Sequence, residues 1–151
     1  MNFHLAQMNV ARLRAPLEDP SNADFVTGVD LMNELADRSP GFVWRLREED
    51  VDPSTLPGPK PDDMIVTMSV WESLERLRDY VYHSTHLDYL RRRRDWFVPG
   101  GSAMVLWWVE AGHIPHITEG LQRLALLGAH GPGPRAFTFR QPFPAPVPAD
   151  A

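Results

Sequence analysis

The chain contains no cysteine among its 151 residues, which excludes disulfide bonds, thiolate catalysis and cysteine-ligated zinc sites. It also lacks an excess of positive charge, because 15 Lys and Arg residues are outnumbered by 20 Asp and Glu residues and the net charge is -5 at pH 7. Nucleic-acid binding requires a basic surface, so no nucleic-acid partner is expected. The hydrophobic and charged fractions, 43% and 23%, are those of an ordinary globular domain.

Long apolar runs are absent as well, and none approaches the length that spans a bilayer. The first residues lead directly into strand-like sequence rather than into a signal peptide. We therefore expect a cytoplasmic protein that has no membrane partner. The 15 prolines concentrate in a loop over residues 53–61 and near the C-terminus. This distribution predicts a single domain over residues 1–141, followed by a proline-rich tail over residues 142–151.

The common catalytic motifs are also missing. No Gly-x-Ser-x-Gly elbow supports a serine hydrolase, and the glycines of residues 131–134 alternate with prolines, which makes that segment too rigid to cradle a phosphate. Residues 113–116 read His-Ile-Pro-His and could clamp a metal. Pro115 and the lack of carboxylates at a matching spacing favour instead a loop that shapes the mouth of a pocket. We predict no metal site.

Periodicity predicts an α+β fold, because segments that alternate apolar and polar residues are interleaved with segments of helical spacing. Ser21 and Thr85 are expected to cap the first and third helices. The order is βαββαβ with an extra C-terminal helix and tail, which is the ferredoxin-like arrangement. The expected strands span residues 3–13, 42–47, 64–71 and 103–109, with a possible edge strand at 136–140. The expected helices span residues 25–38, 73–82, 85–97 and 118–129.

Large apolar side chains occupy both faces of several expected strands, as at Trp107 and Trp108. A ferredoxin-like unit covers only one face of its antiparallel sheet with helices. Packing the sheets of two subunits into a barrel would cover the second face, and twofold dimers are the commonest oligomers. The sequence therefore predicts a homodimer that forms a dimeric α+β barrel.

Aromatic and histidine residues concentrate between residues 66 and 97. If Thr85 caps a helix, His86 lies in its first turn, where the helix dipole disfavours the imidazolium. A neutral imidazole can serve as a general base, a hydrogen-bond acceptor, or a metal or haem ligand. Tyr89 and Arg93 would share its helix face, with His83 nearby. The alternative is that these are amphipathic residues at a helix junction, with their polar tips in water.

Four consecutive arginines, residues 91–94, point in four directions on a helix and therefore do not form one basic patch. We interpret them as a solvated face, and the alternative is capture of an anion by Arg91 or Arg94. The five tryptophans favour core or interface positions, although one or two could line a cavity for a planar ligand.

The chain resembles a bacterial family known as domain of unknown function 3291. The resemblance runs from residues 3–9 through 136–143 and so covers nearly the full length. Its recurrent pieces are Ser-Pro-Gly-Phe-Val-Trp-Arg-Leu at residues 39–46, Ser-Val-Trp-Glu-Ser at 69–73 and Gly-His-Ile-Pro at 112–115.

Residues 70–73, followed by Tyr80 and His86, are similar to the pattern of antibiotic biosynthesis monooxygenase-like proteins, which include haem-degrading monooxygenases. The resemblance implies a dimeric α+β barrel whose pocket is surrounded by an asparagine on the first strand, an aromatic residue on the second helix and a histidine near the end of that helix. The matching positions are Asn9, Tyr80 and His86. Tyr80 replaces the usual tryptophan and the spacing to the histidine is shorter, which argues against haem but leaves the pocket location unchanged.

The resemblance implies a monooxygenase-like enzyme that acts on a small aromatic or polyketide-type molecule. Asn9 would position an oxyanion or peroxide, His86 would act as a base, and Tyr80 and Trp44 would hold the ring. No cofactor is required if the substrate itself reacts with oxygen; haem is the alternative cofactor. A non-catalytic small-molecule or haem-binding protein, or a structural dimer, remains open. The expected substrate-binding residues are Trp44, His83, Tyr89, Trp107 and Arg93.

Overall fold

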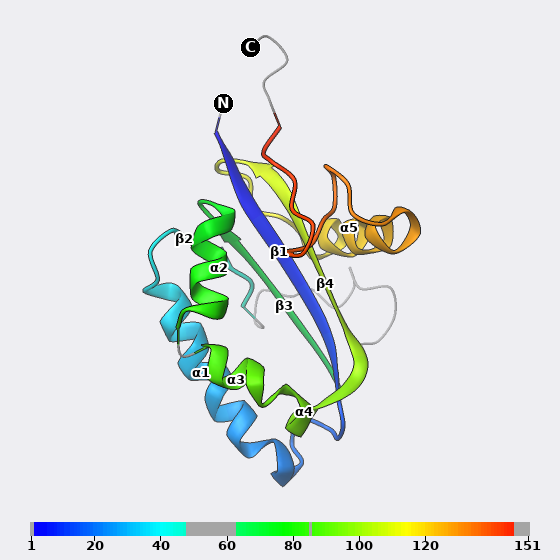
Figure 1. Cartoon of the computed structure of the whole chain (residues 1–151). Helices are drawn as coiled ribbons and strands as arrows, with labels where there is room; N and C mark the ends of the chain where they lie inside the picture. Colours follow the sequence, from blue (N-terminus) through cyan, green and yellow to red (C-terminus); the bar gives the residue numbers. More distant parts are fainter. Residues whose placement is uncertain (1, 48–62, 85, 147–151) are drawn as a thin grey trace.

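A four-stranded antiparallel sheet forms the centre of the protein (Figure 1). The computed structural model describes residues 2–47, 63–84 and 86–146. The predicted cap at Thr85, the predicted loop over residues 53–61 and the end of the predicted tail therefore lie outside the described residues. The strand order β2-β3-β1-β4 confirms the ferredoxin-like prediction. The strands are β1 (Phe3–Leu13), β2 (Phe42–Arg45), β3 (Met64–Trp71) and β4 (Phe97–Glu110).

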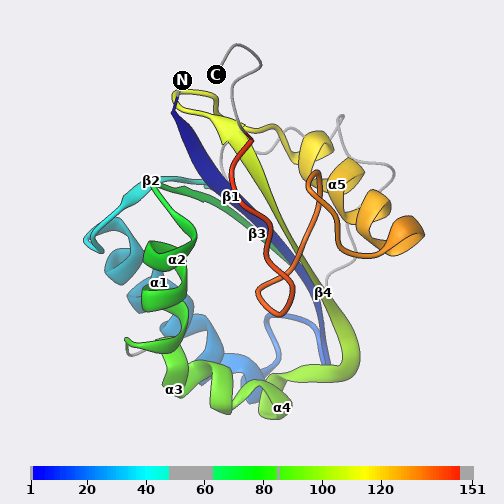
Figure 2. The same ribbon diagram turned by 45° about the horizontal axis from the view of Figure 1, so that its top comes forward.

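The helices lie on both sides of the sheet, with α1 to α4 along one face and α5 against the other (Figure 2). None of the helices in the described part of the chain is long and apolar enough to cross a membrane. The helices are the 3-10 turn η1 (Pro20–Asn22), α1 (Ala23–Asp37), α2 (Leu74–Tyr82), α3 (His86–Arg91), α4 (Arg93–Trp96) and α5 (Ile117–His130).

Alternation along β1 produces two separate cores. Leu5 packs with Trp71 and Leu74 on the side of α1 and α2, whereas Ala6 and Met8 pack on the side of α5. We call these two surfaces the helix-layer face and the α5 face. Both are apolar, as the sequence predicts, but the α5 face is covered in part by a helix of the same chain. The second subunit that the sequence analysis invoked for this purpose stays a prediction.

The predicted helix over residues 85–97 is wrong in its length. It divides into α3 and α4 at Arg92, and the chain enters β4 at Phe97. Strand β4 begins earlier than predicted because Phe97 pairs with Leu13 across an irregularity in the β1–β4 register. Pro99 and the following glycines, which we expected to close a helix, lie inside β4; Gly100 has φ +75°, a conformation that favours glycine. His86 and Arg93 consequently do not share one continuous helix.

The predicted cap at Ser21 is also wrong. Asp19 caps η1 by accepting a hydrogen bond from the Ser21 backbone N–H at 2.9 Å, and α1 follows Asn22 without a side-chain cap. The buried Asn22 carboxamide instead donates to the carbonyl oxygens of Ala15, at 3.2 Å, and Pro16, at 2.9 Å. This amide therefore fixes the connection from β1 to α1.

The predicted edge strand over residues 136–140 is reduced to a single bridge. Phe137 exchanges two backbone hydrogen bonds of 2.8 Å with Leu106 of β4 and is fully buried. Further along, the Phe143 carbonyl accepts a hydrogen bond from the Trp108 indole at 2.9 Å. The segment between them crosses the helix-layer face, where Phe139 contacts Tyr82 with ring centroids 5.6 Å apart. This part of the predicted tail region belongs to the packed body.

Gly28 is the closest point of contact between α1 and α3. A Cβ at this position would lie 2.2 Å from Cε1 of Tyr89, a rigid ring. We expect Gly28→Ala to lower the free energy of unfolding by about 1–3 kcal/mol, because overpacking displaces α3. Gly128→Ala in α5 is the matched control, since its Cβ would meet no atom within 4 Å, and it should raise stability by up to about 1 kcal/mol. Urea unfolding measures both, and equal effects would contradict the close packing.

Candidate functional site

Three aromatic rings contact one another in sequence between the sheet and the helix layer, with Trp71 and Tyr80 stacked and Tyr80 and His86 tilted by 48°. The centroids of Trp71 and Tyr80 are 5.1 Å apart, and those of Tyr80 and His86 are 4.9 Å apart. The Tyr80 hydroxyl donates to the Met32 carbonyl of α1 at 2.9 Å. The stack therefore joins β3, α2 and α3, and the tyrosine attaches it to α1.

His86 is held in one tautomer. Its Nδ1 lies 3.2 Å from the Val81 carbonyl oxygen, and because a carbonyl only accepts, Nδ1 carries the hydrogen. In the neutral ring, Nε2 is then an unprotonated acceptor. Burial lowers the pKa of His86, and the hydrogen bond to Val81 opposes this shift. The lowered pKa favours the neutral imidazole that the sequence predicts. Burial causes the shift, rather than the predicted helix dipole.

Tyr80 is suited to hold a ring rather than to transfer a proton. Its pKa is raised to about 12 by burial, an effect that Arg45 opposes and Asp37 reinforces. Its hydroxyl hydrogen is already donated to Met32. The phenol thus stays protonated at neutral pH, and its ring positions His86.

Asn9 lies in the middle of the helix-layer face, paired in register with Thr67 and Met104. Its side chain makes no hydrogen bond to any residue that the structure describes. Two residues earlier, the Gln7 carboxamide donates to Ser69 Oγ at 2.8 Å. The Trp71 indole donates to the same oxygen at 2.9 Å.

Gln7, Ser69 and Trp71 were not among the predicted site residues. The available signal was the alternation of β1, which places Gln7 on the same face as Asn9. The pairing of Gln7 with Ser69 across β1 and β3 could not be read from the sequence, because it depends on the strand register.

The structure does not bring all the predicted substrate-binding residues together. Trp44 and Trp107 belong to the α5 face, opposite Tyr80 and His86. Trp107 is fully buried there, and its indole donates to a carboxylate oxygen of Glu119 at 2.8 Å. The sheet therefore separates these two tryptophans from the stacked rings.

The remaining predicted residues lie on the helix-layer side. His83 is exposed at the C-cap of α2, and Arg93 is exposed on α4. Tyr89 packs against Gly28 and stacks on Trp96 with centroids 6.1 Å apart. Tyr89 thus has a packing role between α1, α3 and α4.

The four consecutive arginines are exposed, as their interpretation as a solvated face predicts. Arg92 contacts Asp24 at 3.3 Å and Asp95 at 3.1 Å, and its guanidinium lies 4.7 Å from the Trp96 ring centroid. These are surface contacts that attach α4 to α1.

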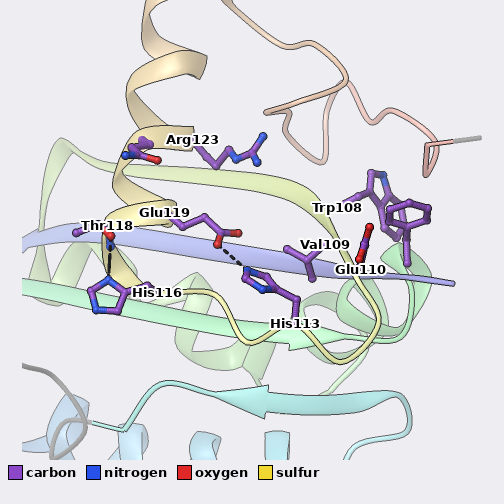
Figure 3. Close-up of a pocket in the computed structure, with 10 residues that line it drawn as sticks. Trp108, Val109, Glu110, His113, His116, Thr118, Glu119 and Arg123 are labelled. Carbon is purple, nitrogen blue, oxygen red and sulfur yellow. Dashed lines mark hydrogen bonds and ion pairs between the residues drawn. The ribbon is translucent and has the colours of Figure 1, made fainter. Parts of the chain in front are cut away.

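A hollow of about 580 Å³ opens on the α5 face (Figure 3). His113 Nε2 lies 2.7 Å from Glu119 Oε1 in it, and His116 also lines it, so residues 113–116 shape a pocket mouth as predicted. A second hollow, of about 270 Å³, is lined by Glu34, Asp37 and Arg38. Neither hollow is lined by Asn9, Tyr80 or His86.

Within the described ranges, no group of three or more His, Cys, Asp or Glu side chains could hold a metal ion. Around His86 the structure offers a half-buried neutral base beside the aromatic ring of Tyr80.

Comparison with known proteins identifies the family of the chain and supports its fold. The sequence profile of "Domain of unknown function (DUF3291)" matches residues 4–150. No curated protein matches the chain. Among solved structures, NE2512, a protein of unknown function from Nitrosomonas europaea, is 8% identical with a TM-score of 0.50, covering 76% of this chain and 96% of its own.

SnoaB, a cofactor-independent oxygenase from Streptomyces nogalater, is 19% identical with a TM-score of 0.48, covering 75% of this chain and 98% of its own. The similarity to NE2512 supports the ferredoxin-like fold, and neither similarity transfers an activity.

The lowered pKa of His86 predicts a titration that NMR can follow through its ring protons. We expect a midpoint below 6.5, the ordinary histidine value. Because the folded pKa lies below the unfolded one, stability should be full above pH 6.5 and be lost as the pH falls toward the folded pKa. His86→Gln should remove this loss from urea unfolding, whereas His130→Gln, exposed at the end of α5, should retain it. A His86 midpoint at or above 6.5 would show that the ring is not buried as described.

Proposed function

The chain belongs to the family of domain of unknown function DUF3291, and we propose that it is a monooxygenase-like enzyme that oxidises a small aromatic or polyketide-type molecule without a cofactor. The observation that carries the proposal is the state of His86, a half-buried neutral imidazole whose Nδ1 is committed to Val81. Its Nε2 is left as a base on the helix-layer side, where the sheet presents Asn9.

The reaction follows from one proton transfer. His86 Nε2 takes the hydroxyl proton of a phenol, and the oxyanion delocalises its charge onto the para carbon. That carbon bonds to O₂ to give a hydroperoxide, and loss of water leaves a carbonyl. For 1-naphthol the balance is one naphthol and one O₂ to one 1,4-naphthoquinone and one water. The substrate supplies the electrons, so no cofactor is needed.

Asn9 would stabilise the oxygen-centred charge of this reaction. Its carboxamide N–H groups can donate to an oxyanion or to a bound peroxide. Tyr80 supplies a ring face beside His86, and we propose His83, Tyr89 and Arg93 as further substrate contacts around α3. Trp44 and Trp107 do not enter the proposal, because they lie on the α5 face.

Haem is the alternative cofactor, because Nε2 of His86 could ligate iron while Nδ1 is bonded to Val81. We derive no step through it. A Soret band in protein incubated with haem, absent in His86→Ala, would support haem and overturn the cofactor-free proposal.

We also propose that the protein is a homodimer whose sheets meet on the α5 face. Helix α5 covers part of this face near Met8, where Gly120 permits close approach. Val10, Val66 and Trp44 lie on the same face and are only partly buried. These apolar side chains support a second copy as the remaining cover.

The enzyme hypothesis predicts O₂ uptake with electron-rich phenols such as 1-naphthol, with 1,4-naphthoquinone formed in equal amount. His86→Ala should lower kcat/KM by about 10²–10⁴-fold, because it removes the base. Asn9→Ala should lower it by about 10²–10³-fold, because it removes an oxyanion donor. His130→Ala is the control, and it should be unchanged. Binding of phenols without O₂ uptake would instead support a non-catalytic binding protein.

The dimer hypothesis predicts a mass in solution of twice the 17.2 kDa chain, measured by light scattering after gel filtration. Val66→Glu should shift the protein to 17.2 kDa, because a charge on a buried interface is costly. Thr67→Glu is the matched control, since Thr67 is the exposed neighbour on the other face, and it should remain dimeric. A wild-type mass of 17.2 kDa at micromolar concentration would overturn the dimer.

A further inference from the structure

Four polar side chains interrupt the apolar helix-layer face of the sheet. Gln7 and Asn9 of β1 lie opposite Ser69 and Thr67 of β3. A sheet face that is covered by helices is normally apolar, because burying an unpaired polar group costs free energy. Gln7 and Ser69 are nonetheless only 9% exposed. Such a departure from the expected pattern is typical of a functional site.

The hydroxyl of Ser69 has a hydrogen left to donate. Its oxygen accepts from Gln7 Nε2 at 2.8 Å and from Trp71 Nε1 at 2.9 Å. These two bonds use both acceptor positions of a hydroxyl oxygen. No acceptor for its hydrogen is found among the residues that the structure describes. A ligand oxygen could take this donor.

Gln7 has an acceptor left over. Its Nε2 is bonded to Ser69, while its Oε1 has no partner within the described part of the chain. Over the same residues, the only fully buried side-chain nitrogen or oxygen without a partner is Nδ1 of His4. Gln7 Oε1 is therefore not fully buried. A ligand that reached this part of the sheet would meet one donor, on Ser69, and one acceptor, on Gln7.

Ser69 is connected to the candidate base, His86, through the rings of Trp71 and Tyr80. Trp71, which donates to Ser69, stacks on Tyr80, and Tyr80 contacts His86 in a tilted arrangement. The two centroid separations of 5.1 and 4.9 Å place the Trp71 indole and the imidazole no more than about 10 Å apart. A fused two- or three-ring aromatic spans such a distance. One end of it could face His86 while the other lies over Ser69.

We propose that Gln7 and Ser69 form an oxygen-binding subsite that selects fused aromatic substrates bearing a second hydroxyl or carbonyl on the ring remote from His86. A hydroxyl there can donate to Gln7 Oε1 and accept from Ser69 O–H, and a carbonyl can accept from Ser69. The subsite rests on the proposed function, since His86 and Asn9 define the reacting end. Gln7 and Ser69 are positioning residues, because they touch the substrate away from the reacting carbon.

The test compares two substrates that differ by one oxygen. 1,5-Dihydroxynaphthalene and O₂ give 5-hydroxy-1,4-naphthoquinone and water, and 1-naphthol and O₂ give 1,4-naphthoquinone and water. We expect kcat/KM of the wild-type protein to favour the diol by about 10–100-fold, because a polar site is left unpaired by the analogue that lacks the group. The preference should appear mainly in KM.

Gln7→Met and Ser69→Ala should remove this preference, so that the kcat/KM values of each variant for the two substrates differ by no more than about threefold. Ser69→Thr, which keeps the hydroxyl, should retain the preference even if Ser69→Ala folds poorly. Asn22→Ala is the control for a structural effect, because Asn22 is an equally buried amide bonded only to backbone near α1. It should lower stability without changing the preference.

Anaerobic binding separates the subsite from the enzyme hypothesis. Quenching of tryptophan fluorescence by the two naphthols gives their Kd values without turnover. No O₂ uptake, with tighter binding of the diol that Gln7→Met abolishes, would overturn the enzyme and support the subsite. O₂ uptake with equal kcat/KM for the two substrates, or a preference unchanged in Gln7→Met, would overturn the subsite and leave the enzyme in place.

Discussion

The hydrogen bond from the Tyr80 hydroxyl to the Met32 carbonyl holds the helix layer in place. Through it α2 is fixed to α1, and through contacts of the same ring α2 is fixed to Trp71 of the sheet and to His86 of α3. One half-buried phenol thus joins three helices and a strand. Its burial raises its own pKa and contributes to the dry surroundings that lower the pKa of His86. The position and protonation state of the candidate base both depend on this contact.

The two faces of the sheet differ in composition, because successive side chains of β1 alternate between them. Ala6 and Met8 fill the α5 face, where Gly120 lets the helix approach. Gln7 and Asn9 point the other way, between Leu5 and the end of the strand. A strand with apolar side chains on both faces would pack equally well against the helices on either side. The polar pair on one face therefore carries no advantage for packing, which is why we assign it to ligand binding.

The sequence was sufficient for the strand order and for the helix-layer position of Tyr80 and His86, because these depend on local periodicity and on one known arrangement of elements. It was insufficient at the end of the third helix. Four arginines and Trp96 have adequate helix propensity, but pairing of Phe97 with Leu13 extends β4 and ends the helix early. Trp44 and Trp107 show a second limit, since hydrophobicity alone does not reveal which face of a sheet a tryptophan occupies.

Ser69 could not be identified as a site residue from the sequence, because a single serine in a strand has no distinctive pattern. Its significance comes from the number of bonds to one oxygen, which requires the register of β1 with β3 and the rotamer of Trp71. A serine that only braced the indole would be satisfied by accepting one bond and donating another to protein. Here it accepts two and its hydrogen is directed elsewhere. Gln7 Oε1 likewise has no partner among the described residues, and the pairing of Gln7 with Ser69 in the β1–β3 register brings this acceptor and the Ser69 donor to neighbouring positions on the sheet.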